Sequence, residues 1–215
     1  MTARDTILRS IQENLRAANA ENASGPIDDE SISRTYRDVA PRAPADRLAL
    51  FEHNLRDYEA GVAHAAPNTI PHAVALSLAP RSLSRLAIPR GLPAEWLPSG
   101  FVFEPADDCD PASLETFHGV LTACTIAIAE TGTIVLQSAP AQGPRRLSLV
   151  PDYHLCIVFD RQLVDTVPEA LAHLAATAAL PTTFISGPSA TSDIEITRVR
   201  GVHGPRTLDV ILVHD

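Results

Sequence analysis

A short apolar run in the C-terminal half most constrains the fold of this chain. Residues 155–159 read LCIVF, and none of the five carries a charged or strongly polar side chain. A strand with apolar residues at consecutive positions is expected where both faces of a sheet are covered. The run therefore predicts a central strand buried between two layers.

Helix and strand patterns alternate on both sides of this run. The spacing of apolar residues predicts helices at 48–58, 70–78 and 167–176, and strands at 62–64, 86–88, 101–103, 125–129, 133–136, 183–186 and 208–213. We expect Gly61 to end the first of these helices and Gly132 to supply the positive φ of a tight reversal. The alternation predicts an α/β sandwich with a mainly parallel sheet and one antiparallel excursion around Gly132.

The N-terminal segment reads differently from the rest. Residues 3–17 predict an amphipathic helix, with Ile7, Leu8, Ile11 and Leu15 on one face. Residues 18–44 are poor in large apolar side chains and read as a linker. We therefore expect an N-terminal helix and linker over residues 1–45, packing on the body or on a neighbour, and one domain over residues 46–215.

Composition excludes several classes of protein. The formal charge of −9 argues against a nucleic-acid partner, because phosphate binding requires a basic face. Cys109, Cys124 and Cys156 have no CxxC spacing, which gives no zinc or iron–sulfur ligand set and is typical of reduced thiols in the cytoplasm. The longest apolar stretch, residues 125–136, is too short to span a bilayer. We expect a cytoplasmic protein without membrane insertion.

The stretch SGPSATSDIE, residues 186–195, is the first candidate site. Its glycine permits close backbone approach, its hydroxyls are suited to capping a turn or binding an oxyanion, and its carboxylates to taking a proton or holding a metal. The candidate ligand-binding residues are Gly187, Pro188, Ser189, Thr191 and Glu195, and the candidate catalytic acid is Asp193. The alternative is a capped turn with two solvated acids, because any turn uses these residue types.

The stretch GVHGPR, residues 201–206, is the second candidate site. His203 lies between two glycines, and histidine is the side chain best suited to proton transfer near neutral pH. Gly204 and Arg206 are candidates for binding a ligand, since a guanidinium pairs with a carboxylate or phosphate. The alternative is a loop histidine bonded to a carbonyl, with Arg206 paired to Asp193 or Glu195.

Two further groups complete the candidate set. Glu130 stands at the end of an apolar strand, where a carboxylate is costly to desolvate unless it has a partner, and it is followed by Thr131, Gly132 and Thr133. The alternative is a glutamate that accepts hydrogen bonds from the amides of its own turn. The Arg145–Arg146 pair and His154 flank a short apolar segment and form either an anion clamp or a solvated pair.

Taken together, four sequence motifs of this chain resemble one family. The order and spacing of four motifs match the LutC/YkgG family, whose members carry the LUD (lactate-utilisation) domain. These motifs are IAETGTIVL (128–136), RRLSLVPDYHLCIV (145–158), SGPSATSDIE and GVHGPR. The matching positions are Glu130, Thr131, Gly132, Thr133, Arg146, His154, Gly187, Pro188, Ser189, Thr191, Asp193, Glu195, His203, Gly204, Pro205 and Arg206. The family often has a second proline or a small residue where this chain has Asp152–Tyr153.

The resemblance implies a fold and a role. The fold is a Rossmann-like three-layer α/β sandwich of the NagB/RpiA/CoA-transferase-like type. The role is in oxidation of L-lactate to pyruvate, together with an iron–sulfur oxidoreductase and a ferredoxin-like LUD protein. This chain lacks the cluster-binding cysteines, so it corresponds to the cluster-free accessory subunit, which binds a small carboxylate, a phosphate compound or the partner's LUD domain.

The residues are also compatible with two other functions. By analogy with enzymes of the same fold, the chain acts on an activated acid or a sugar phosphate with Glu130 as nucleophile. Alternatively, it senses lactate or a related metabolite without turning it over. No Walker loop, GxGxxG, HExxH or GxSxG motif occurs, so we expect no metal, flavin or nicotinamide cofactor.

Overall fold

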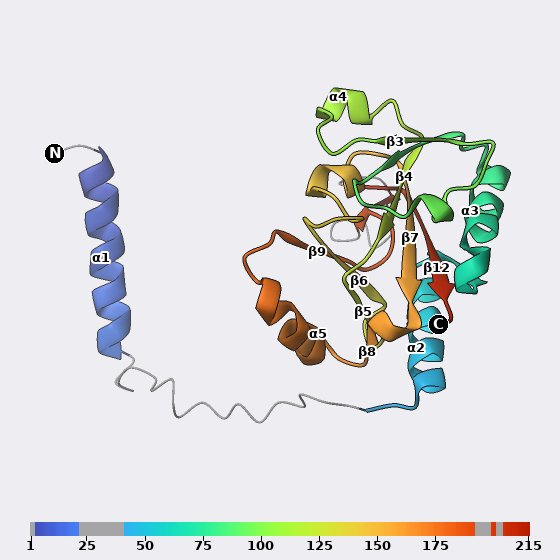
Figure 1. Ribbon diagram of the computed structural model, residues 1–215. Helices are drawn as coiled ribbons and strands as arrows, with labels where there is room; N and C mark the ends of the chain where they lie inside the picture. Colours follow the sequence, from blue (N-terminus) through green and yellow to red (C-terminus); the bar gives the residue numbers. More distant parts are fainter. Residues whose placement is uncertain (1–2, 22–40, 192–198, 201–203) are drawn as a thin grey trace. The chain divides into compact units, whose positions relative to one another are not determined.

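The structure is a computed structural model that describes residues 3–21, 41–191, 199–200 and 204–215. Residues 1–37 and 38–215 form two separate compact units. The first unit contains α1 (Ala3–Glu21), which confirms the predicted helix and extends it by four residues (Figure 1). Its apolar side chains Ile7, Leu8, Ile11 and Leu15 are exposed.

The second unit is built on a sheet of six parallel strands (Figure 1). In spatial order these are β1 (Gly61–Ala65), β12 (Thr207–Val213), β7 (Tyr153–Phe159), β4 (Gly119–Ala123), β2 (Arg85–Ile88) and β3 (Val102–Pro105). Strands β7 and β12 pair along their whole length, from Tyr153 beside Thr207 to Phe159 beside Val213. All seven residues of β7 are buried, which confirms the predicted central strand.

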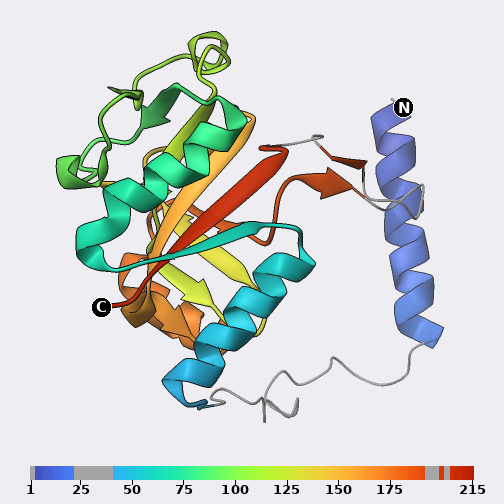
Figure 2. The same ribbon diagram turned by 90° about the vertical axis from the view of Figure 1, so that its right-hand side faces the viewer.

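Different elements cover the two faces of this sheet (Figure 2). Helix α3 (Ile70–Leu78) packs on one face through Ile70, Val74 and Leu78. Helix α2 (Pro44–Asp57) packs on the other face through Phe51 and Leu55. A second, smaller sheet lies beside α2 in the same core, and it is the predicted antiparallel excursion.

The small sheet has the strand order β8-β5-β6-β9. Its strands are β8 (Leu163–Val164), β5 (Ile126–Ile128), β6 (Thr133–Gln137) and β9 (Thr182–Ile185). Gly132 joins β5 to β6 with φ 58°, as predicted, and an added Cβ there would lie 2.8 Å from the Cβ of Asn54. The α/β sandwich with a mainly parallel sheet is therefore confirmed.

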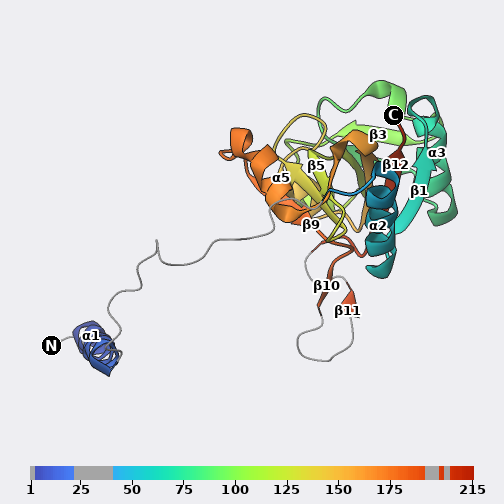
Figure 3. The ribbon, with the colours of Figure 1, turned by 90° about the horizontal axis from the view of Figure 1, so that it is seen from below.

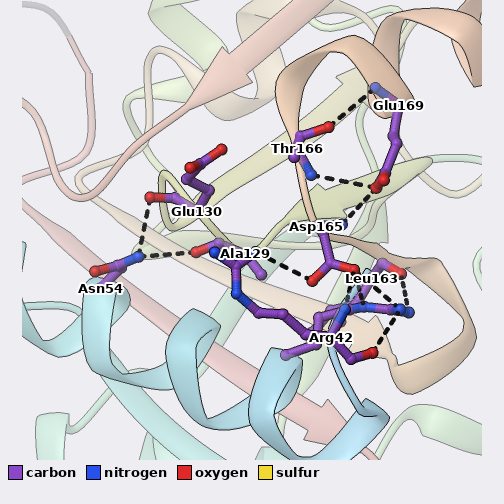
Figure 4. Close-up of polar contacts among 9 residues, drawn as sticks. Arg42, Asn54, Ala129, Glu130, Leu163, Asp165, Thr166 and Glu169 are labelled. Atoms are coloured by element: carbon purple, nitrogen blue, oxygen red, sulfur yellow. Dashed lines mark hydrogen bonds and ion pairs between the residues drawn. The ribbon is translucent and has the colours of Figure 1, made fainter. Parts of the chain in front are cut away.

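Helix α5 (Val167–Leu174) covers the outer face of the small sheet through Ala170 and Leu174. Thr166 and Glu169 cap its N-terminus reciprocally, side chain to backbone (Figure 4). Asp165, which precedes Thr166, has a side chain only 2% exposed, and it pairs with Arg42 (Figure 4). Arg47 forms a second ion pair with it. These two ion pairs attach the first turn of α2 and the segment just before it to the residue that follows β8.

Some elements differ from the sequence prediction. Strand β4 lies at the centre of the sheet but was not predicted, and neither were β8 and the one-turn helix α4 (Pro111–Leu114). The prediction that Gly61 ends α2 is wrong, because α2 ends at Asp57 and the left-handed position after it is occupied by Glu59, with φ 63°. Gly61 instead begins β1, where an added Cβ would lie 2.2 Å from Oδ1 of Asp209.

Asp209 is the centre of a buried polar cluster on β12. The Tyr153 hydroxyl donates to its Oδ2 at 2.9 Å, and Arg81 donates to both carboxylate oxygens at 3.1 and 3.0 Å. Burial and the neighbouring carboxylate raise the pKa of Tyr153 far above its ordinary value, so its hydroxyl keeps its proton. A glycine is thus required at position 61, because a side chain there would collide with the Asp209 carboxylate.

We expect Asp209→Ala to lower the free energy of unfolding by about 2–4 kcal/mol, because it leaves Arg81 and the Tyr153 hydroxyl without their acceptor. Urea denaturation at pH 7 measures this loss. The matched control is Glu104→Ala, which removes the solvent-exposed pair with Arg85 and should cost far less. Equal losses in the two variants would contradict this account of Asp209.

Candidate functional site

A cavity of about 450 Å³ lies between the loop after β9 and the amino ends of β7 and β12. Its polar side chains are those of Arg145, Ser148, His154, Ser186 and Ser189. Its remaining lining is apolar side chains and backbone, including Leu149, Phe184, Ile185 and Leu208. No acidic residue belongs to the lining among the residues that the structure describes.

His154 is the buried polar group of this cavity. It is the second residue of β7 and is 1% exposed. Its Nε2 lies 2.8 Å from the Thr122 hydroxyl on β4. Burial lowers the pKa of His154 to about 4, so the imidazole is neutral at physiological pH. Its Nδ1 has no hydrogen-bond partner within the described part of the chain.

The hydroxyl of Thr122 contacts both His154 and Cys156. The Thr122 hydroxyl donates to Sγ of Cys156 at 3.7 Å, and that thiol donates to the Ile157 carbonyl. A hydroxyl has one hydrogen, so Thr122 accepts from Nε2 of His154 when it donates to Cys156. In that arrangement Nδ1 keeps a lone pair and is a hydrogen-bond acceptor.

The two polar loops of the sequence meet at this cavity. The amide of Ser189 donates to the carbonyl of Pro205 at 2.8 Å. Beyond them, β10 (Ala190–Thr191) and β11 (Val199–Arg200) pair as antiparallel strands (Figure 3). The predicted candidates that line the cavity are His154, Gly187, Pro188, Ser189 and Gly204.

Gly187 serves the packing of its own loop. It is buried with φ 80°, and an added Cβ would lie 2.6 Å from the Cβ of Tyr58, just after α2. The sequence predicted close backbone approach at this glycine. In the structure the approaching group is the protein's own Tyr58, which fixes where the loop leaves β9.

The turn that carries Glu130 touches the cavity loop through hydroxyl groups. Oγ1 of Thr133 lies 2.7 Å from Oγ1 of Thr131 and 2.7 Å from Oγ of Ser186. Glu130 itself is exposed and does not line the cavity. Asn54 of α2 donates to the carbonyl oxygens of Ala129 and Glu130, so the contact uses the backbone and not the carboxylate (Figure 4).

The two candidate arginines lie away from the cavity lining. Arg146 donates to the carbonyl oxygens of Asp107 and Cys109 and so holds that loop. Arg206 is exposed, and its Nε lies 3.4 Å from Oδ1 of Asp152. The alternative expectation paired Arg206 with an acid, and Asp152 is such an acid among the described residues; Asp193 and Glu195 lie outside them.

Three candidates cannot be placed on this site. Asp193, Glu195 and His203 lie outside the described residues, and so does the side chain of Thr191. Their catalytic and binding roles stay predictions.

Sequence reasoning missed the partners that make His154 a site residue. Thr122 belongs to the unpredicted strand β4, and no local pattern connects it to a histidine 32 positions later. Phe184 and Ser148 were not singled out as lining residues. Arg145 was noticed only as half of a basic pair, and the structure separates the two: Arg145 lines the cavity, while Arg146 binds a loop.

The structure offers no preformed multidentate metal site in its described parts. Within residues 3–21, 41–191, 199–200 and 204–215, no group of three or more His, Cys, Asp or Glu side chains is arranged to hold a metal ion. The cysteines are free thiols, with Cys124 and Cys156 buried and Cys109 partly exposed. Among the described residues, the lining of the cavity has one cation, Arg145, and one neutral imidazole, His154.

The sequence of this chain is closely similar to a protein of known family. It is 44% identical over 181 residues to lactate utilization protein C of Deinococcus radiodurans, covering 83% of this chain and 84% of that protein. This chain belongs to the lactate utilization protein C family. The LUD domain of that family matches residues 107–213, which include all the described residues that line the cavity.

Two further similarities agree with this assignment. Lactate utilization protein C of Shouchella clausii is 40% identical over 100 residues, covering 44% of this chain and 43% of that protein. The crystal structure of a DUF162 family protein from Deinococcus radiodurans superposes with a TM-score of 0.71 and 39% identity, covering 80% of this chain and 99% of that chain. In the described part of this family member, no helix has the length and apolar character needed to cross a bilayer.

We expect the buried His154 to make this LUD-domain protein sensitive to acid. The unfolded chain binds a proton at His154 near pH 6.5, whereas the folded chain binds one only near pH 4, so folding becomes less favourable as pH falls through this window. The loss reaches about 3 kcal/mol below pH 4. Urea denaturation at pH 7 and pH 5 should show this dependence weakened in His154→Gln. The control His53→Gln, an exposed histidine on α2, should retain it.

Proposed function

We propose that this chain is the cluster-free, small-ligand-binding subunit of the L-lactate utilisation system. The observation that carries the role is its similarity along 83% of its length to a protein named lactate utilization protein C. The ligand site is the cavity of His154 and Arg145, and its ligand is a small 2-hydroxy or 2-keto carboxylate.

The chemistry of the cavity supports a carboxylate ligand. Arg145 is the one guanidinium among the described lining residues, and its side chain makes no ion pair within the described chain. It is therefore available to pair with a carboxylate. The Nδ1 lone pair of His154 accepts a hydrogen bond, which suits the hydroxyl of a 2-hydroxy acid. Apolar residues such as Leu208 and Phe184 face the carbon skeleton.

The same residues support binding in preference to chemistry. A group with a pKa of about 4 is a weak base at neutral pH, so His154 is poorly matched to removing a proton from lactate. Electron transfer would then take place in iron–sulfur partners, in keeping with the non-redox role. The alternative enzyme with Glu130 as nucleophile receives less support, because Glu130 does not line the cavity.

Three further elements of the proposal concern the chain as a whole. Its partners are the iron–sulfur oxidoreductase and the ferredoxin-like LUD protein of lactate utilisation. Its location is the cytoplasm. Its LUD domain comprises residues 46–215, preceded by the helix and linker of residues 1–45.

We expect L-lactate or pyruvate to raise the melting temperature of the purified protein. Arg145→Gln should weaken binding about 10- to 100-fold, because a hydrogen bond to a charged group contributes about 1.5–3 kcal/mol. Isothermal titration measures the dissociation constant. The matched control Arg90→Gln, an exposed arginine outside this cavity, should bind as the wild type does. Equal affinities in the two variants would remove the cavity from the proposal.

A growth experiment tests the role independently of the cavity. Deleting the gene from a host that depends on L-lactate should abolish growth on lactate, and the wild-type gene should restore it. Full lactate-dependent electron transfer by the iron–sulfur partners in the absence of this chain would refute the accessory role.

A further inference from the structure

Strand β9 lies at one edge of the small sheet, so one side of its backbone is open (Figure 1). Its other side pairs with β6 in antiparallel register. The amide of Ser138 donates to the carbonyl of Pro181, and hydrogen-bonded pairs alternate along an antiparallel ladder, so positions 183 and 185 also bond to β6. The backbone amides and carbonyls of Thr182 and Phe184 therefore point away from the sheet, and they have no backbone partner within the described part of the chain.

The outer face of β9 is apolar and uncovered. Phe184 lies beside Val135 of β6, on the face of the small sheet that α5 covers. Val135 is fully buried beneath α5, whereas Phe184 is 48% exposed. Val167 and Leu171 of α5 and Leu180, just before β9, are exposed as well. Exposed apolar side chains are therefore concentrated in the segment that ends on the open edge.

The other edge strands of the two large sheets have protection that β9 lacks. A charged side chain or a proline at an edge opposes pairing with another chain. Strand β3 ends with Glu104 and Pro105. Arg56 donates to a carbonyl of β1, and Arg47 donates to a carbonyl of β8. Residues 182–185 of β9 read TTFI and include neither a charge nor a proline. The edge of β9 is therefore suited to pairing with a further strand.

The open edge of β9 is complementary to itself. Two copies related by a two-fold axis can pair in antiparallel fashion, with Thr182 of one copy opposite Phe184 of the other. This register pairs every outward-facing residue of the strand, and each such pair exchanges two hydrogen bonds. The Phe184 ring of each copy then packs beside Thr182 of the partner subunit. A second copy matches the strand in length, in backbone pattern and in its lack of charge.

We propose that two copies of this chain associate through β9, so that their two four-stranded sheets become one continuous sheet. A two-fold contact of this kind uses the same strand of both copies and leaves no open edge at β9, so association ends at the dimer. Phe184 also lines the cavity, so the interface adjoins the cavity wall. The association does not depend on the ligand proposed for that cavity.

Sedimentation velocity of the full chain over roughly 1–100 μM tests the association, because specific dimers commonly form in or below this range. We expect a dimer. Phe184→Lys places a charge at the centre of the interface and should raise the dissociation constant at least about 30-fold. The matched control is Val102→Lys, which changes a valine that is 51% exposed on the edge strand β3 and should leave the dimer intact. A wild-type chain that is monomeric throughout, or a dimer that Phe184→Lys leaves unchanged, would overturn the proposal.

Thr183→Cys tests the register without relying on a loss of association. In the proposed pairing, residue 183 faces its own copy as a non-hydrogen-bonded pair with a Cα separation of about 4.5 Å, which a disulfide can span. Oxidised glutathione should convert the two thiols into an intermolecular disulfide and itself be reduced to the thiol. Mass spectrometry of the non-reduced peptides identifies the bond, and the wild type shows any background from Cys109.

Thr182→Cys is the control in the same strand. In the proposed register the two copies of residue 182 are diagonal neighbours about 7–8 Å apart, which is beyond the reach of a disulfide. Cross-linking of Thr183→Cys with little or none of Thr182→Cys is the expected result. Equal cross-linking of the two variants, cross-linking of Thr182→Cys alone, or none in either would overturn the proposal.

Discussion

The parallel pairing of β7 with β12 is the constraint on which the rest of the second unit depends. The two strands pair over seven residues, and nearly every side chain on them is buried. Such strands are stable only if both faces of the sheet are covered. This requirement explains why α3 occupies one face, while α2 and the small sheet occupy the other.

The polar residues of these two strands lie near their ends, where each can meet a partner. At the amino end, His154 binds Thr122 on β4, and Asp209 binds Arg81 and Tyr153. Just beyond the carboxyl ends, His214 and Asp160 face each other. Because an unpaired polar group is costly inside a core, each of these positions is fixed by its neighbour. The cavity and the contact between His214 and Asp160 therefore lie at opposite ends of the same strands.

The sequence predicted which loops form the candidate site better than it predicted which side chains line the cavity. The loops after β9 and before β12 were each recognised as a polar candidate site, and they meet through Ser189 and Pro205. Arg145 and Arg146 are indistinguishable in sequence, yet only Arg145 reaches the cavity. Glu130 looked costly to desolvate at the end of an apolar strand, but the turn leaves its side chain exposed. These outcomes depend on where neighbouring segments lie, which local patterns do not encode.

The sequence by itself determined the α/β class, the buried central strand, the reversal at Gly132 and the family, because each depends on residues close together in the chain. Only the tertiary structure decided the partners of distant residues. Strand order placed Thr122 beside His154, gave Gly61 its role against Asp209 and brought His64 next to His214, 150 residues away. The physical reason is that strand pairing and burial act across the whole chain, whereas periodicity and turn chemistry act within a few residues.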